Sequence, residues 1–170
     1  MITQFSKVLI LAVSMALSAC VQMTVDAPGV CDSQPLGTVP ASPVPVSNPP
    51  PLSYSQTFDF SDTVKKVNNV ADSSNVTITQ FVLTGDSDLG WVKEVTVTVG
   101  GQVFASYISG VHPQNSITMQ VQMDSQTLTE LLQHPINLLF TLRASSAPLV
   151  AVNFSANLCV DVSAQVNKSL

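Results

Sequence analysis

The stretch VKEVTVTVGGQVFASYI, Val92–Ile108, decides the fold class of this 170-residue chain. Two runs that alternate apolar and polar residues flank the pair Gly100-Gly101. A Gly-Gly pair supplies the positive φ angles of a two-residue turn, so the stretch predicts an antiparallel β-hairpin. Val95, Val97 and Val99 are expected to face a core, because successive side chains of a strand point to opposite faces.

Further strands are expected on both sides of this hairpin. The runs with β-branched residues or alternation are Asn75–Leu83, Ile117–Met123, Ile136–Arg143 and Leu149–Val162. In the first run, Val76, Ile78 and Val82 are expected on one side of the strand. The short spacing between the runs favours antiparallel pairing. The sequence therefore predicts an all-β domain over residues 53–166, a single antiparallel β-sandwich of the immunoglobulin-like or jelly-roll type.

Two short helical turns are also expected within this domain. The segment SDTVKKVNNV, residues 61–70, places valines at a spacing of three behind a capping Ser61 or Asp62. The segment SQTLTELL, residues 125–132, has Ser125 as its expected cap and ends before a His-Pro pair.

The first nineteen residues have the pattern of an export signal. Lys7 precedes a ten-residue apolar run that is too short to span a bilayer, and small residues follow. The tetrapeptide Leu17-Ser18-Ala19-Cys20 resembles the lipobox of bacterial lipoproteins. This resemblance implies cleavage before Cys20, a diacylglycerol on its thiol and an acyl chain on its new amine. The alternative is ordinary secretion, with Cys20 as a free thiol.

The residue after the lipobox bears on location. In enteric-type bacteria an Asp at that place tends to retain a lipoprotein at the inner membrane, whereas this chain has Val21. The resemblance therefore implies a lipid-anchored protein of the outer membrane and leaves open whether it faces the periplasm or the cell surface.

Residues 28–51 hold eight of the eleven prolines. Proline has no amide hydrogen and biases the residue before it toward extended backbone. Residues 20–52 are therefore expected to form an extended tether outside the core, and residues 167–170 a short tail.

The three cysteines suggest one disulfide. In Leu149–Val162, Cys159 has the parity opposite to the apolar residues, so its side chain is expected to point outward. If Cys20 is lipidated, Cys31 is the remaining partner, and an oxidising compartment favours a Cys31–Cys159 bond over two free thiols. Such a bond is expected to fold the tether across the outer surface of the sandwich. Eleven residues, about 35 Å of extended chain, would then separate the domain from its anchor.

The charge balance argues against two classes of partner. The chain has 6 basic and 11 acidic residues, a formal net charge of −5. Removal of residues 1–19 takes away Lys7, which leaves 5 basic against 11 acidic residues, or −6. Nucleic acids and anionic bilayer surfaces both attract basic patches, so neither is expected as a direct partner.

The sequence shows no constellation typical of an enzyme. His112 and His134 each precede a proline, and no ligand spacing or nucleophile-elbow motif accompanies them. Residues 84–88, TGDSD, carry two Asp that could offer oxygens to calcium, but Gly, Asp and Ser are also ordinary turn residues, and the turn is favoured. We expect no catalytic activity, no metal and no cofactor.

Trp91 and Tyr107 are the candidates for an aromatic platform that binds a sugar, although a single Trp beside a strand is more often part of a core. The blocks at residues 81–99 and 136–162 give the domain a diffuse resemblance to uncharacterised envelope lipoproteins of Gram-negative bacteria. That resemblance implies no catalytic positions. The expected role is a structural or protein-interaction module for an unidentified envelope protein. The alternative is a carbohydrate-binding module for peptidoglycan or surface polysaccharide.

Overall fold

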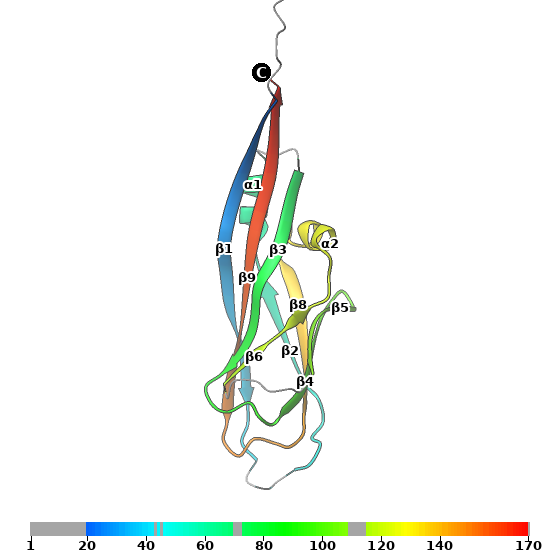
Figure 1. The fold of residues 1–170 in the computed structure, drawn as a ribbon. Helices are drawn as coiled ribbons and strands as arrows, with labels where there is room; N and C mark the ends of the chain where they lie inside the picture. The colour runs from blue at the N-terminus through cyan, green and yellow to red at the C-terminus, as the bar shows by residue number, and fades with distance from the viewer. Residues whose placement is uncertain (1–19, 43, 45, 70–72, 109–114, 170) are drawn as a thin grey trace, which may run out of the picture.

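The computed structural model describes residues 20–42, 44, 46–69, 73–108 and 115–169, without the side chains of 20–23 and 167–169. The expected export signal at 1–19 and His112 lie outside these residues. Figure 1 shows the elements, which are β1 (Cys20–Val39), β2 (Leu52–Phe58), α1 (Ser61–Asn68), β3 (Ser73–Gly85), β4 (Val92–Val99), β5 (Gln102–Ile108), β6 (Ser116–Thr118), β7 (Gln120–Val121), α2 (Ser125–Leu131), β8 (Ile136–Ala144) and β9 (Val152–Ser169).

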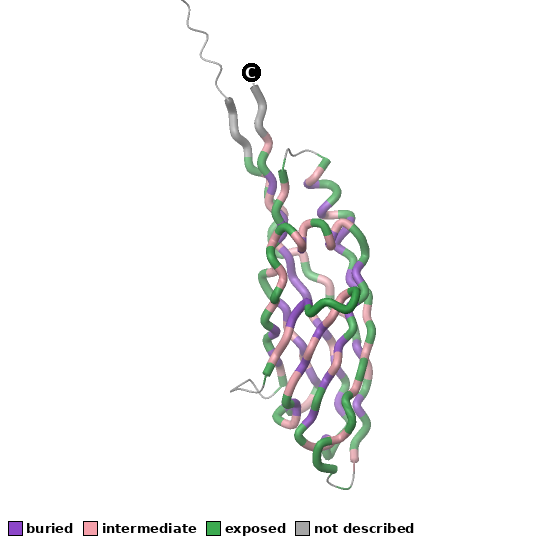
Figure 2. The backbone as a smooth tube through the Cα atoms, turned by 90° about the vertical axis from the view of Figure 1, so that its right-hand side faces the viewer, coloured by how far each residue is buried: buried purple, intermediate pink, exposed green. Residues whose placement is uncertain are grey.

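Two antiparallel sheets pack face to face, which confirms the predicted all-β sandwich. One has the strand order β1-β9-β3-β6 and the other β2-β8-β4-β5-β7. Their inner faces form one continuous apolar core, and Figure 2 shows the buried positions along the length of the elongated body. The rings of Phe81, Phe104 and Phe140 meet at its centre and join the two sheets. The finer assignment to the immunoglobulin-like or jelly-roll type stays a prediction.

The expected tether over residues 20–52 is wrong for its first twenty residues. They form β1, which pairs with β9 from Cys20 opposite Ser169 to Val39 opposite Val152. The prolines fit because β1 is an edge strand with two irregularities in its pairing, one at 27–30 and one at 35–37. Edges and bulges are the places where a sheet accepts proline. The described residues of the remaining proline-rich segment, 40–51, form a loop, and among them Ser47 forms a bridge to Ser146.

A glycine brings β1 close to the second sheet. Gly37 has φ +146°, and a Cβ at this position would lie 2.9 Å from Cε1 of Tyr54 on β2. The absence of a side chain therefore lets the Tyr54 ring pack against the backbone of β1. Burial raises the pKa of the Tyr54 hydroxyl. Residues 20–39 thus belong to the domain whose start was expected at residue 53.

The predicted core face of β9 is confirmed from Val152 onward. Its buried members are Val152, Phe154, Ala156, Leu158, Val160 and Val162. The strand begins later than expected, because Leu149 and Val150 lie in the preceding loop and are 74% and 58% exposed. It also extends further, to Ser169, because β1 supplies a partner for the residues expected to form a tail.

In β3 the expected apolar side is wrong after the first half of the strand. Val76 is buried as predicted, but a bulge between Ile78 and Gln80 adds one residue and reverses the alternation. Phe81 and Leu83 therefore face the core, and Val82 is only half-buried.

The hairpin that decided the fold class is confirmed. β4 and β5 pair around Gly100 and Gly101, whose φ angles are +56° and +84°. The expected single strand over 117–123 is instead divided. β6 pairs with β3 in one sheet, and β7 pairs with β5 in the other. The chain changes sheets at Met119, whose backbone N–H donates to the carbonyl of Phe81 at 2.8 Å.

Both helices are present, but their expected caps are wrong. α1 has no side-chain cap. Asp59, two residues before the first helical residue, accepts a hydrogen bond from the N–H of Ser61. In α2 the cap is Asp124, one residue before the expected Ser125. Ser125 instead contacts β3: its hydroxyl donates to the carbonyl of Val76 at 3.2 Å. The hydroxyl of Thr129 accepts from the N–H of Val76, so α2 occupies part of the free edge of β3.

The cap of α2 predicts a pH-dependent stability. Hydrogen bonds from the backbone N–H and the hydroxyl of Thr127 lower the pKa of Asp124. A lowered folded-state pKa contributes stability above the unfolded-state pKa, and that stability is lost as the pH falls through the folded-state value. We expect wild type to have a higher melting temperature than Asp124→Asn at pH 7, and the difference to shrink as the pH falls below about 4, the usual pKa of an Asp, through the lower folded-state pKa. Asparagine keeps the capping oxygen but does not titrate.

Thermal unfolding followed by circular dichroism from pH 7 to pH 2.5 measures this difference. Asp62→Asn, which removes an exposed carboxylate from the first turn of α1, is the control of equal charge change. A difference that stays constant down to pH 2.5 would contradict the prediction.

Candidate functional site

The two ends of the described chain lie side by side. Cys20, the residue expected to carry lipid, pairs with Ser169 at the start of the β1–β9 ladder. The loops 40–51, 86–91 and 145–151 lie at the opposite end of the molecule, which we call the distal end (Figure 1). The molecule therefore has an end that holds Cys20 and a separate end made of loops.

The predicted disulfide is confirmed, but the position of the segment that holds Cys31 differs from the expected one. Cys31 and Cys159 are bonded, with an S–S distance of 2.13 Å, and are direct partners in the pairing of β1 with β9. The segment around Cys31 is thus a strand of the same sheet and does not cross its outer surface. Cys159 is only 4% exposed although it shares the outward parity of Asn153 and Asp161, because Cys31 lies against it.

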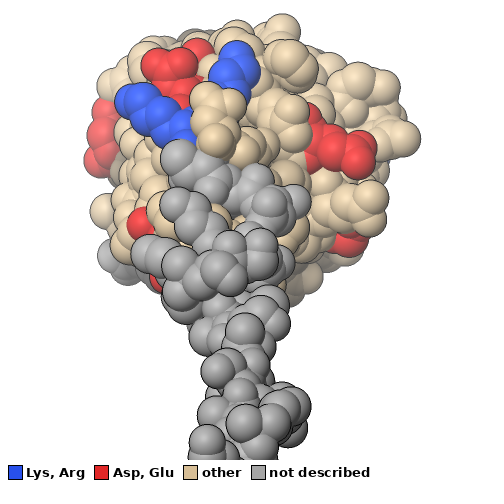
Figure 3. Space-filling view, turned by 90° about the horizontal axis from the view of Figure 1, so that it is seen from above, with Lys and Arg blue, Asp and Glu red and all other residues tan. Residues whose placement is uncertain are grey.

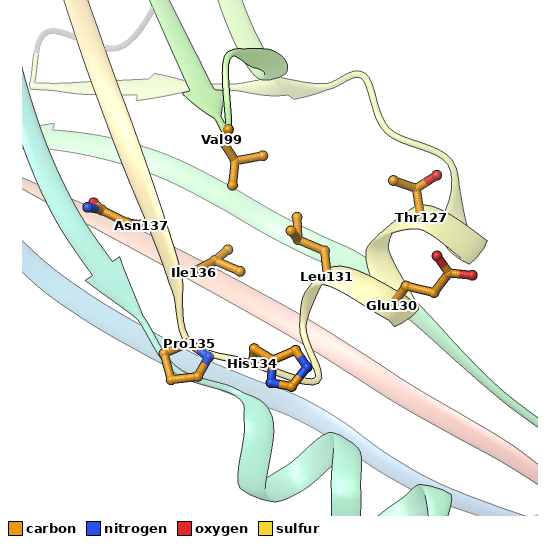
Figure 4. Close-up of a pocket in the computed structure, with 9 residues that line it drawn as sticks. Val99, Thr127, Glu130, Leu131, His134, Pro135, Ile136 and Asn137 are labelled. Carbon is orange, nitrogen blue, oxygen red and sulfur yellow. The ribbon is translucent and has the colours of Figure 1, made fainter.

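A shallow hollow of about 520 Å³ lies beside α2, between the hairpin turn and the start of β8. Val99, Leu131 and Ile136 point toward one another and form its apolar floor (Figure 4). Glu130 and His134 are also on its wall, but the carboxylate of Glu130 points away from the imidazole (Figure 4). The two side chains therefore do not form an acid–base pair in this geometry.

The two carboxylates of the acidic turn stabilise the backbone around them. Asp86 accepts from the N–H of Asn153 at 3.0 Å and from its side-chain amide at 2.5 Å. Asp88 accepts from the N–H of Gly90 at 3.0 Å. These contacts support the turn interpretation. Among the described residues there is no group of three or more His, Cys, Asp or Glu placed to hold a metal ion.

Trp91 is half-buried at the distal end. Its Nε1–H donates to the carbonyl of Asp88 at 2.9 Å, and its ring meets Phe154 edge-on, with centroids 5.9 Å apart. Tyr107 is also half-buried, but it lies on β5 opposite Val95. Both rings pack against the core, and Tyr107 does not line the hollow beside α2.

Two neighbouring cavities share Trp91, Ala147 and Pro148 as walls. The first, the distal pocket, has a volume of about 210 Å³ and is lined by Val39, Pro40, Ala41, Ser42, Pro49, Pro50, Leu52, Trp91, Ala144, Ala147 and Pro148. The second, the distal groove, has a volume of about 380 Å³ and is lined by Ser87, Asp88, Trp91, Ser146, Ala147, Pro148, Leu149 and Val150. Asp88 is the charged residue among these walls. The pair offers an apolar recess with a carboxylate beside it.

The opposite end has a different surface. Figure 3, which looks onto the end that holds Cys20 and Ser169, shows basic and acidic side chains close together on a mostly uncharged surface. On the described part of this face neither sign forms an extended patch. In the described residues, no helix has the length and apolar character needed to cross a bilayer.

Comparisons with protein-family models, with curated proteins and with solved structures found no match to this chain. The candidate site therefore rests on its own geometry.

Sequence reasoning singled out Trp91 but missed the two cavities around it. Most of their walls come from three loops that lie more than thirty residues apart in the sequence, so no local pattern reveals them. Two signals were nonetheless present. Loop 40–51 contains six prolines, a composition typical of a loop, and the apolar pair Leu149-Val150 follows Pro148, where a turn is as compatible as a strand.

Proposed function

We propose that this protein is a lipid-anchored, non-enzymatic lipoprotein of the outer membrane, in which a β-sandwich holds an interaction site away from the membrane. The observation that carries the proposal is the position of Cys20 and of the distal cavities at opposite ends of β1. A lipid on Cys20 would place the loops far from the bilayer. The partner would be another component of the cell envelope.

The length of β1 supports display at a distance. Twenty strand residues at ~3.3 Å each span about 65 Å. The Cys31–Cys159 bond ties β1 to β9 and so resists detachment of the strand that would carry the load between anchor and body. This replaces the expectation of a domain held about 35 Å from its anchor by a folded-back tether.

Lipidation is tested by growing cells that express the full chain with labelled palmitate. We expect label on wild type and on Cys31→Ser/Cys159→Ser, and no label on Cys20→Ser. Comparison of the two variants distinguishes labelling of the lipobox cysteine from labelling of the disulfide cysteines. Label-free wild-type protein in the soluble envelope fraction would refute the anchor.

Orientation is tested on the lipidated protein in vesicles that carry a fluorescent acceptor on their headgroups. A donor on Ser73→Cys, at the start of β3, should transfer energy strongly to the acceptor. A donor on Ala41→Cys, in the distal loop, should transfer weakly, because about 60 Å separates that loop from the anchor. Equal transfer from both positions would mean that the body lies flat on the membrane and would contradict display at a distance.

A carbohydrate-binding module is the second candidate, and one observation favours it. Trp91 lines the open distal groove beside the carboxylate of Asp88 and the hydroxyls of Ser87 and Ser146. Aromatic rings with neighbouring polar groups suit sugars as ligands. Tyr107, the other expected platform residue, does not line this groove.

A further inference from the structure

Three loops build one site at the distal end, and its chemistry selects a class of ligand. We propose that the distal pocket and groove bind a peptide segment of a partner protein in which an apolar side chain stands next to a lysine or arginine. The apolar side chain would enter the pocket, and the cation would lie in the groove at Asp88. This inference rests on the proposed role as an interaction module, but it does not depend on the lipid anchor.

The pocket is preformed by rigid backbone. Four of its walls are prolines, Pro40, Pro49, Pro50 and Pro148, whose rings fix φ. Hydrogen bonds hold the two proline-bearing loops together: Ser42 N–H donates to Pro148 O at 2.9 Å, and Ala147 N–H donates to Val46 O at 3.1 Å. A cavity that keeps its shape without a ligand loses little conformational entropy when one binds.

Trp91 is a fixed wall of both cavities. Its N–H is occupied by the carbonyl of Asp88, and its ring is held edge-on against Phe154. The indole thus offers the cavities an apolar surface. A pocket of about 210 Å³ is below the ~300–1,000 Å³ of typical small-molecule sites, and its size suits one side chain of a larger partner.

Asp88 sets the charge of the ligand. Its Oδ1 accepts from Gly90 N–H, while among the described residues Oδ2 has no hydrogen-bond donor. The residue is exposed, and the other walls of both cavities are uncharged. A cationic side chain that reaches the groove therefore meets a carboxylate with an open oxygen, whereas an anionic one is repelled.

The rim favours a peptide over a glycan. Leu149 and Val150 are among the most exposed large apolar side chains described, and both line the groove. Exposed aliphatic side chains around a recess are typical of contacts between proteins. A sugar would need several polar partners in their place.

The single tryptophan of the chain makes the test direct, because its fluorescence reports from inside the proposed site. The full chain is titrated with three blocked hexapeptides that contain Leu-Lys, Leu-Glu or Ser-Lys between Gly-Ser flanks. We expect a saturable change in Trp91 emission with the Leu-Lys peptide, and a response at least several-fold weaker with the other two.

Two variants locate the binding, and a third is the control. Asp88→Asn keeps the acceptor for Gly90 N–H and should weaken binding of the Leu-Lys peptide about two- to fivefold, the range of an exposed ion pair. Ala147→Leu, which fills the shared wall, should weaken it more than about tenfold. Glu130→Gln, at the hollow beside α2, should leave it unchanged.

Equal responses to all three peptides, or none, would overturn the proposal, as would an unchanged affinity in Asp88→Asn. A saturable response to chitotriose without one to the Leu-Lys peptide would assign the site to a glycan. Because the titration does not require lipid, palmitate labelling without peptide binding would refute this inference alone. Peptide binding without labelling would refute only the anchor.

Discussion

Replacement of Phe81 by alanine should lower the free energy of unfolding by about 3–5 kcal/mol. The side chain is 2% exposed and lies at the centre of the core, with its ring centroid 5.8 Å from that of Phe104 and 6.0 Å from that of Phe140. Phe81 belongs to one sheet, and the other two rings belong to the facing sheet. The substitution therefore removes apolar contact between the sheets and leaves a cavity that the rigid strands cannot fill.

Urea unfolding of the wild type and the variant measures this loss. The matched control is Val103→Ala on β5, which also shortens an apolar side chain but at a position that is 42% exposed. A surface substitution of this kind should change stability by less than about 0.5 kcal/mol. A loss below about 1 kcal/mol for Phe81→Ala would mean that Phe81 does not occupy the shared core.

Removal of the disulfide should have the second large effect. The bond joins residues 128 positions apart, for which the chain-entropy model gives a stabilisation of up to about 5 kcal/mol. Measured losses of native disulfides are typically 2–5 kcal/mol, and we expect Cys31→Ala/Cys159→Ala to fall in that range. The bond joins an edge strand to its neighbour. Its removal should therefore speed the exchange of the backbone amides of β1 with solvent more than that of the amides of β8.

Reductant supplies the control for this prediction. It should lower the stability of the wild type toward that of the double variant and leave the double variant unchanged. Hydrogen exchange followed by mass spectrometry locates the change along the chain. Wild-type stability that is unaffected by reductant, with two free thiols detected by alkylation, would contradict a stabilising role for the bond.

Local patterns predicted the elements whose environment is local. The hairpin around Gly100-Gly101 follows from two alternating runs and a turn that requires positive φ, and all of these lie within seventeen residues. The core face of β9 follows from its alternation, and the outward parity of Cys159 led to its bond with Cys31. The α2 cap was missed by one residue because Asp124 and Ser125 are both good capping residues.

The errors arose where a distant partner overrides a local tendency. Proline content favoured a tether at 20–39, but the edge of β9 offers these residues a ladder that tolerates proline at two bulges. Alternation over 117–123 suits one strand or two equally, and only the position of Phe81 and Phe104 divides it between sheets. The bulge in β3 has no sequence signature such as glycine.

By itself, the sequence determined that this chain forms an antiparallel β-sandwich, because alternation and turn residues are properties of neighbouring residues. The Cys31–Cys159 bond followed from the outward parity of Cys159 together with the lipobox resemblance, which assigns Cys20 to lipid. Only the tertiary structure decided that Cys20 and the distal cavities lie at opposite ends. That arrangement depends on the antiparallel pairing of the first described strand with the last, and on three loops that meet across a sequence distance no local interaction spans.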